Sequence, residues 1–248
     1  MADALYDWPE LYDLVCQRDP MMESHYLRHA GKAGLRTLEL ACGTGRLTLP
    51  LAQSGTEVTA GDLSGAMLER ARQRAMALGL AVDFHQLDMR SFALGRQFDR
   101  IVIAANSLLH LTSLDDFAQF LGSVRAHLQD DGLLLFDIFV PSAALLSRPR
   151  GERQLVGDFA REGAGPVRLE ETIDYDAASQ ISHVTWYWSS ETEKDFAATP
   201  LTMRQVYPQE LTALLALGGF RIAERFGGFD GETFGRTSRR QVVIATPN

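Results

Sequence analysis

The chain of 248 residues is long enough for one domain with a sizeable insertion, and its composition, 46% hydrophobic and 23% charged, is typical of a globular protein. A net charge of −8 disfavours binding to nucleic-acid backbones, which depends on clustered Lys and Arg. No apolar run approaches the roughly 18 residues of a membrane span, and the first residues do not read as a signal segment. Cys16 and Cys42 lie too far apart in sequence to suggest a metal site. We expect no disulfide framework from two cysteines, and hence a reducing compartment. We therefore expect a cytoplasmic monomer or homodimer with no metal and with no nucleic-acid or membrane partner.

The first part of the chain alternates short apolar runs with longer amphipathic stretches. Strands are predicted at residues 37–41, 57–61, 82–86, 98–104 and 133–139, and helices at 46–53, 66–78 and 114–128. Alternating helices and continuously apolar strands favour a parallel sheet that is covered on both faces.

After Val140 the pattern changes. Residues 141–165 are rich in Arg, Gly and Pro, which predicts a loop or a loose helix. β-like runs at 168–175, 181–189 and 201–206 predict an antiparallel meander, and a helix at 208–217 with strands at 221–225 and 241–246 follows. The fold predicted is α/β, a Rossmann-like seven-stranded mixed sheet flanked by helices, with a small antiparallel β insertion after the fifth strand. Residues 1–140 and 208–248 would form the main domain, and 141–207 the insertion.

The strongest local signal is LELACGTG at residues 38–45, which places Gly43 and Gly45 between a strand and a helix. Only glycine lets the backbone turn this tightly and approach a ligand this closely. Such a turn is typical of a nucleotide-cofactor site in open α/β sheets, although a plain tight turn explains it as well. The third glycine of a dinucleotide fingerprint is replaced by Thr48, which disfavours an NAD-dependent oxidoreductase.

Two aspartates follow the next two strands. Asp62 is placed to accept hydrogen bonds from both hydroxyls of a ribose. Asp88 is placed to accept from an adenine amino group, with Met89 against the ring. Each aspartate alone equally fits a helix cap or a turn. Three such features at successive strand ends favour a bound nucleoside.

On these motifs the chain resembles the class I S-adenosylmethionine-dependent methyltransferases, of the bacterial small-molecule type. The matching stretches are 38–51, 61–71, 87–92, 98–111, 132–141, 201–207, 210–220 and 229–235. The resemblance implies S-adenosyl-L-methionine as cofactor and methyl transfer to a nitrogen or oxygen of a small-molecule acceptor, with residues 141–207 as a lid over the acceptor site. Gly65 departs from the proline of many relatives, and Ala104-Ala105 from the Pro-Phe of some.

The resemblance also implies which residues hold the cofactor. Gly43 and Gly45 would line its methionine part, with Glu39 supporting that loop. Tyr12 would belong to an N-terminal segment that folds over the cofactor, and the Ala105 backbone would face its amino group. The full set implied is Tyr12, Glu39, Ala41, Gly43, Gly45, Asp62, Leu63, Met67, Asp88, Met89 and Ala105, in which Leu63 and Met67 flank the adenine.

On the acceptor side, His110 is the best candidate for a general base, because it follows the fourth strand at the ligand-binding edge of the sheet. A packing or capping role explains it equally. Tyr207 and Arg204 lie where the insertion returns to the main domain. Arg204 could bind a substrate carboxylate or form an interdomain ion pair. The run 186–188, Trp-Tyr-Trp, suggests an aromatic cage, but its two tryptophans share one strand face and fit a core better.

Other function classes fit less well. A nucleic-acid methyltransferase that modifies exocyclic amines would show an N-P-P-Y-like motif after the fourth strand, where this chain has AANS at residues 104–107. Nothing marks a peptide groove, as a protein methyltransferase would need. A methyltransferase acting on a macromolecule, or a non-catalytic cofactor-binding or partner-binding module, remains the alternative.

Overall fold

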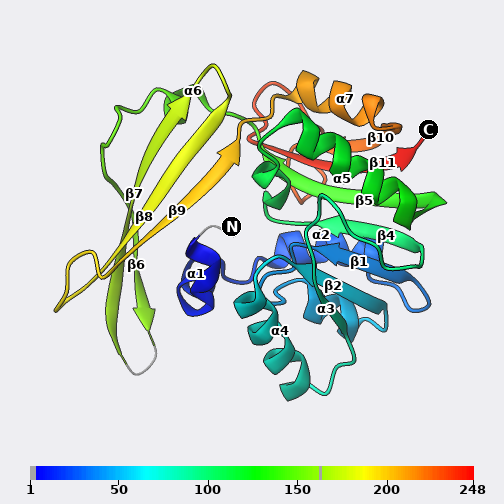
Figure 1. Cartoon of the computed structure of the whole chain (residues 1–248), viewed down its shortest axis with the longest axis horizontal. Coiled ribbons are helices and arrows are strands. Elements are labelled where there is room, and N and C mark those ends of the chain that lie inside the picture. The colour runs from blue at the N-terminus through cyan, green and yellow to red at the C-terminus, as the bar shows by residue number, and fades with distance from the viewer. Residues whose placement is uncertain (1–3, 162–163) are drawn as a thin grey trace.

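The computed structural model describes residues 4–161 and 164–248, which include a seven-stranded sheet of order β10-β11-β5-β4-β1-β2-β3 (Figure 1). Neighbouring pairs among β1–β5 run parallel, while β11 runs antiparallel to β5 and β10. This arrangement confirms the predicted seven-stranded mixed sheet. The strands are β1 (Arg36–Leu40), β2 (Glu57–Asp62), β3 (Asp83–Gln86), β4 (Phe98–Ile103), β5 (Leu128–Phe139), β10 (Phe220–Phe226) and β11 (Arg240–Pro247).

Helices cover both faces of this sheet because successive strand residues point to opposite sides. In β4, Ile101 and Ile103 pack with α5 (Leu114–His127) and α7 (Pro208–Leu217). Val102 packs on the other face with α2 (Pro20–Ala30), α3 (Thr48–Gln53) and α4 (Gly65–Ala77). Among the described residues, no helix is long and apolar enough to cross a membrane.

The insertion forms a second, antiparallel sheet of order β6-β7-β8-β9, which we call the insertion sheet. Its strands are β6 (Gln154–Arg161), β7 (Ala164–Asp176), β8 (Ile181–Ser190) and β9 (Ala197–Arg204), preceded by the short α6 (Ala143–Leu146). The meander is confirmed, but the loop or loose helix predicted for 141–165 is wrong over β6. No residue of β6 is fully buried, and its sequence lacks the apolar alternation that marks a half-buried strand. Pairing with β7 supplies its hydrogen bonds.

The N-terminal segment, η1 (Ala4–Asp7) with α1 (Pro9–Val15), lies between the two sheets (Figure 1). Leu5 and Leu11 are fully buried in a core that they share with apolar residues of the insertion sheet. Trp188 is the largest side chain of that core, and its Nε1 donates to Thr199 Oγ1 at 3.0 Å. The insertion sheet therefore depends on the N-terminal segment for part of its core.

Leu11→Ala tests this dependence. We expect the free energy of unfolding to fall by about 2–5 kcal/mol, because a buried leucine is replaced by a cavity. Urea unfolding followed by circular dichroism measures the change. Trp8→Ala, in the same segment but with a side chain that is 41% exposed, should change it by less than about 0.5 kcal/mol. Equal effects of the two substitutions would contradict a core at Leu11.

Candidate functional site

Strained backbone gathers at the carboxyl ends of β1 and β4. Ala41, Ala105 and Asn106 have φ values of 54°, 60° and 65°, a region that costs non-glycine residues free energy. Gly43 and Gly45 in the turn after β1 also have positive φ, as the sequence required. Such strain persists only where neighbouring groups hold it, and it is common at ligand sites.

Asp62 ties the glycine turn to the end of β2. Its Oδ2 accepts from the Gly43 N–H at 2.7 Å and its Oδ1 from the Ser64 N–H at 2.9 Å. Burial raises the pKa of Asp62, opposed by these two backbone donors and by the nearby charge that His110 carries when protonated. The carboxylate has further lone pairs, so it can still accept hydroxyl donors from a ligand.

The residues proposed to surround the adenine differ in their exposure to solvent and in the hydrogen bonds they already make. Leu63 is exposed beside Asp62, whereas Met67 is fully buried in the core. Asp88 accepts from Arg90, through Nη2 at 2.6 Å, and this hydrogen bond holds the pKa of Asp88 below its usual value. An adenine amino group would have to share the Asp88 carboxylate with Arg90. The adenine-binding role of Asp88 and Met89 stays a prediction.

Asp137, at the end of β5, holds the strained pair after β4. Its Oδ1 accepts from the Ala105 N–H at 2.8 Å and from the Tyr26 hydroxyl at 2.7 Å, and its Oδ2 accepts from Arg240. Asn106 closes the arrangement, because its Oδ1 accepts from the Phe139 N–H at 2.9 Å. The backbone at Ala105 is thereby fixed at the edge where a cofactor would lie.

The N-terminal segment covers the glycine turn. The Tyr12 ring lies over Gly43, where an added Cβ would meet the Tyr12 hydroxyl at 3.5 Å. Asp13 fastens this cover by accepting from Thr44 Oγ1 and from Arg74 Nη2, both at 2.7 Å. Sequence analysis named Tyr12 but missed the pairing of Asp13 with Arg74, since a charged residue on a helix carries no local signal of a distant partner.

His110, in η2 (Ser107–His110), pairs with both the N-terminal segment and the insertion sheet. Its Nδ1 lies 3.0 Å from the Thr202 carbonyl oxygen, and its Nε2 lies 2.6 Å from the Tyr6 hydroxyl. A carbonyl only accepts, so Nδ1 carries the proton and Nε2 of the neutral ring accepts from Tyr6. Tyr6 was missed by sequence analysis, although the repeated Leu-Tyr-Asp at 5–7 and 11–13 could have marked it.

Arg204 and Tyr207, the two other residues predicted on the acceptor side, lie near the start of α7. Arg204 donates to Glu210 Oε1 at 2.9 Å and to the Thr112 carbonyl at 3.2 Å, so it forms the interdomain ion pair rather than an open carboxylate site. Tyr207 precedes α7 with 42% of its surface exposed. No described group of three or more His, Cys, Asp or Glu residues is placed to hold a metal ion.

The aromatic run divides as the strand pattern predicts. Trp188 is fully buried, and Trp186 meets it edge-on with ring centroids 6.0 Å apart. Tyr187 points to the opposite face, where the Arg153 guanidinium lies 3.6 Å from its ring centroid. The run therefore forms no cage, and Trp186 is left half-buried on the inner face.

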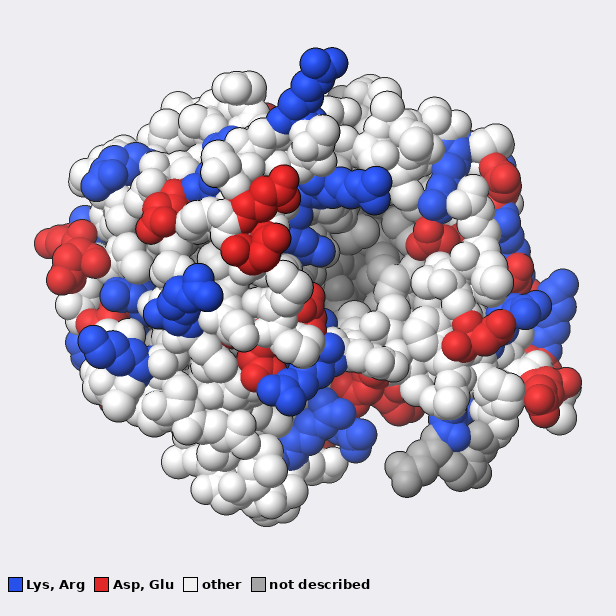
Figure 2. Space-filling view, turned by 180° about the vertical axis from the view of Figure 1, so that it is seen from behind, with Lys and Arg blue, Asp and Glu red and all other residues white. Residues whose placement is uncertain are grey.

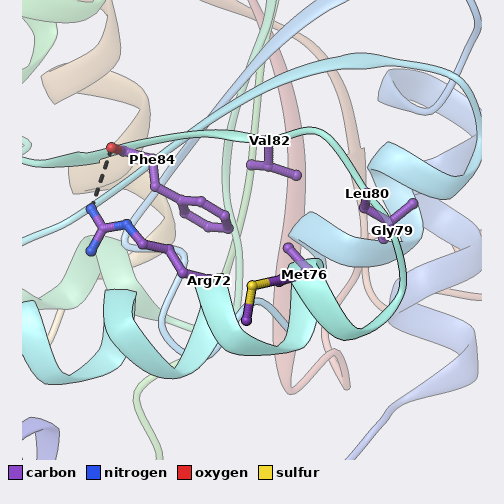
Figure 3. Close-up of a pocket in the computed structure, with 7 residues that line it drawn as sticks. Arg72, Met76, Gly79, Leu80, Val82 and Phe84 are labelled. Carbon is purple, nitrogen blue, oxygen red and sulfur yellow. Dashed lines mark hydrogen bonds between the residues drawn. The ribbon is translucent and has the colours of Figure 1, made fainter.

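A separate pocket lies at the far edge of the sheet, between α4 and β3 (Figure 3). Arg72 lies at one end of it and donates from Nη2 to the Phe84 carbonyl at 3.4 Å. It contains none of the predicted site residues. The residues that line it are Arg72, Ala75, Met76, Gly79, Leu80, Val82 and Phe84.

Part of the chain is similar in sequence to known methyltransferases. A family model described as a methyltransferase domain matches residues 37–132. A putative methyltransferase YqeM of Bacillus subtilis is 41% identical over 104 residues, 42% of each chain. The dTDP-3-amino-3,6-dideoxy-alpha-D-glucopyranose N,N-dimethyltransferase of Streptomyces fradiae is 35% identical over 144 residues, 55% of this chain and 54% of that one. This chain thus spans only about half of the length of these curated relatives.

Solved structures share the fold over nearly the whole chain. The CcbJ methyltransferase from Streptomyces caelestis superposes with a TM-score of 0.83 at 24% identity, over 99% of this chain and 96% of that one. The amino pentose methyltransferase CalS10 from Micromonospora echinaspora superposes with a TM-score of 0.72 at 20% identity, over 100% of this chain and 98% of that one. These matches show that the chain shares the fold of solved methyltransferases.

Glu39 supports the turn from a fully buried position, and its ionisation should make the free energy of unfolding depend on pH. Its Oε2 accepts from Thr48 Oγ1 at 2.5 Å, and burial raises its pKa to about 8. The folded state then binds more protons than the unfolded state between about pH 4.5 and 8, so the free energy of unfolding falls as pH rises through that window. We expect Glu39→Gln, which keeps an acceptor for Thr48, to remove this fall.

Urea unfolding at several pH values measures the effect. The exposed Glu69→Gln serves as the control and should keep the wild-type pH profile. An unchanged profile in Glu39→Gln would show that Glu39 is ionised in the folded protein.

Proposed function

We propose that this chain, whose residues 37–132 match a family model described as a methyltransferase domain, is a class I S-adenosylmethionine-dependent methyltransferase. It would transfer a methyl group to a nitrogen or oxygen of a small-molecule acceptor. The observation that carries the proposal is Asp62 hydrogen-bonded to Gly43 beneath the Tyr12 ring, at the ligand-binding edge of the sheet. We also propose that it works in the cytoplasm as a monomer or homodimer, without a nucleic-acid or membrane partner.

The residues fit S-adenosylmethionine. Asp62 would accept from the ribose hydroxyls, and Asp88 with Met89 would lie at the adenine edge. The turn with Ala41, Gly43 and Gly45 would border the methionine part. When bound, this cofactor supplies an electrophilic methyl group on a positively charged sulfur, so the protein contributes mainly orientation and exclusion of water.

Exclusion of water is the role we assign to the N-terminal segment and to residues 141–207 as a lid. Leu5 and Leu11 join the insertion sheet, while Asp13 fastens the segment to Thr44 and Arg74. We assign Arg204 and Tyr207 to the junction between lid and main domain rather than to catalysis, because Arg204 already pairs with Glu210.

We place proton removal from the acceptor at the Tyr6–His110 pair. The Tyr6 hydroxyl donates to His110 Nε2, so its own lone pairs can accept a proton from the acceptor as its hydrogen passes to the imidazole. Thr202 fixes the ring with the proton on Nδ1. The pair therefore acts as one unit.

Calorimetric titration tests the cofactor assignment. Wild type should bind S-adenosylmethionine and S-adenosylhomocysteine, and NAD should not compete. Asp62→Asn should weaken both by about 1.5–3 kcal/mol, the range for hydrogen bonds to charged groups. Asparagine suits the test better than alanine because its oxygen still accepts from Gly43 or Ser64. Undiminished affinity in a folded Asp62→Asn protein would refute the ribose contact, and NAD binding alone would refute the function.

Turnover tests the proton relay. A metabolite library screened for S-adenosylhomocysteine release supplies the acceptor, and rates are divided by the folded fraction. We expect His110→Ala and Tyr6→Phe each to lower turnover, the former by roughly 10²–10⁴-fold, with cofactor affinity nearly intact. Because the two residues act together, the double variant should resemble the worse single variant. Multiplied effects would contradict a relay in which the two residues act as one unit. A loss of stability without loss of turnover would assign His110 to packing.

A further inference from the structure

One polar row interrupts the inner face of the insertion sheet, which packs toward α1. Glu171 of β7 pairs with Trp186 of β8, and Trp186 pairs with Thr199 of β9. The rows on either side are apolar and almost fully buried: Leu169, Trp188 and Ala197 on one side, and Ile173, Val184 and Leu201 on the other. A carboxylate in such a face needs an explanation.

Glu171 has two partners. Its Oε1 accepts from Arg148 Nη1 at 2.7 Å and its Oε2 from Trp186 Nε1 at 3.3 Å. The side chains of Arg148 and Glu171 remain 21% and 19% exposed, so another molecule can still reach them. On the outer face, Arg168 of the same strand and its partner Asp158 of β6 are more than half exposed, where a charge costs little desolvation. Burying the inner pair, Arg148 and Glu171, costs more desolvation free energy. Well-packed apolar residues at these positions would often stabilise the sheet equally well.

The row lies near the proposed reaction centre. Trp186 packs against the same cluster as Tyr6 and Tyr12. Thr199 precedes Thr202, the partner of His110, by three strand residues, or about 10 Å. Figure 2 shows a hollow between the insertion-sheet side and the larger part of the molecule, with both basic and acidic side chains at its rim. An acceptor about 10 Å long, such as a sugar that carries a further group, would span this distance.

We propose that Arg148, Glu171 and Trp186 bind a hydroxyl-bearing ring, that of a sugar, on the methyl acceptor; this rests on the proposed function. The pair presents a donor and an acceptor side by side, as adjacent ring hydroxyls require. The exposed part of the indole offers an apolar surface for the C–H face of the ring.

The balanced charge of the pair selects against ionic groups at this position. A carboxylate or phosphate placed there would meet Glu171, and an ammonium would meet Arg148. Hydroxyl groups can bond to both partners without such repulsion. The amine or hydroxyl that receives the methyl group would lie beyond the ring, toward Tyr6 and His110.

Calorimetric titration with a panel of methyl glycosides and methyl aminoglycosides tests the inference, with and without saturating S-adenosylhomocysteine. We expect at least one glycoside to bind wild type. Its affinity should fall about tenfold or more in Glu171→Gln and in Trp186→Leu, as expected on loss of hydrogen bonds to a charged group and of a flat aromatic surface. Cyclohexanol, which has one hydroxyl, should bind more weakly and respond less to Glu171→Gln.

Two matched controls come from the opposite face of the same strands. Glu170→Gln and Tyr187→Phe alter neighbours in sequence and should leave glycoside affinity within about twofold. Melting curves establish that each variant folds, and Arg148→Lys supplies a milder change should Glu171→Gln unfold. No glycoside binding to wild type, or equal affinity in the test and control variants, overturns the inference. Absent S-adenosylhomocysteine binding instead overturns the proposed function.

Discussion

Asp137 places a carboxylate at a fully buried position at the end of β5, and the site depends on how that charge is satisfied. A buried carboxylate without partners would cost several kcal/mol. Tyr26 from α2, Arg240 from β11 and the Ala105 N–H each donate to it. Three elements distant in sequence are thereby held at one point. The left-handed backbone of Ala105 and Asn106 is a consequence, since it presents the Ala105 N–H to this acceptor.

Asp62 plays the same part between β1 and β2, at the same edge of the sheet. Its carboxylate holds the Gly43 N–H across the gap between β1 and β2, as Asp137 holds Ala105 across the gap between β4 and β5. Both act at carboxyl ends of parallel strands, where the chain leaves the sheet and backbone donors lose their ladder partners. The resulting edge is rigid, so a cofactor would bind to groups that are already oriented.

The N-terminal segment joins the rigid edge to the insertion sheet. Its leucines enter the core of that sheet, while Tyr6 bonds to His110 and Tyr12 lies on Gly43. The segments proposed as cofactor cover, proton relay and lid therefore form one packed unit. In this unit the two Leu-Tyr-Asp copies divide the work: the first tyrosine faces the proposed acceptor side and the second the cofactor side.

The sequence by itself determined the alternation of strands and helices, the glycine turn and Asp62, because each follows from residues close together in the chain. Apolar periodicity and positive φ are local requirements, and they hold wherever the segment lies. Tertiary structure decided what distant segments meet: β6, which is ordered by pairing with β7; Tyr6, which finds His110 across 104 residues; and Arg204, which is committed to Glu210. The Glu171–Trp186 row also emerged only from strand register. These features depend on contacts between remote residues, and a local pattern carries no record of its partner.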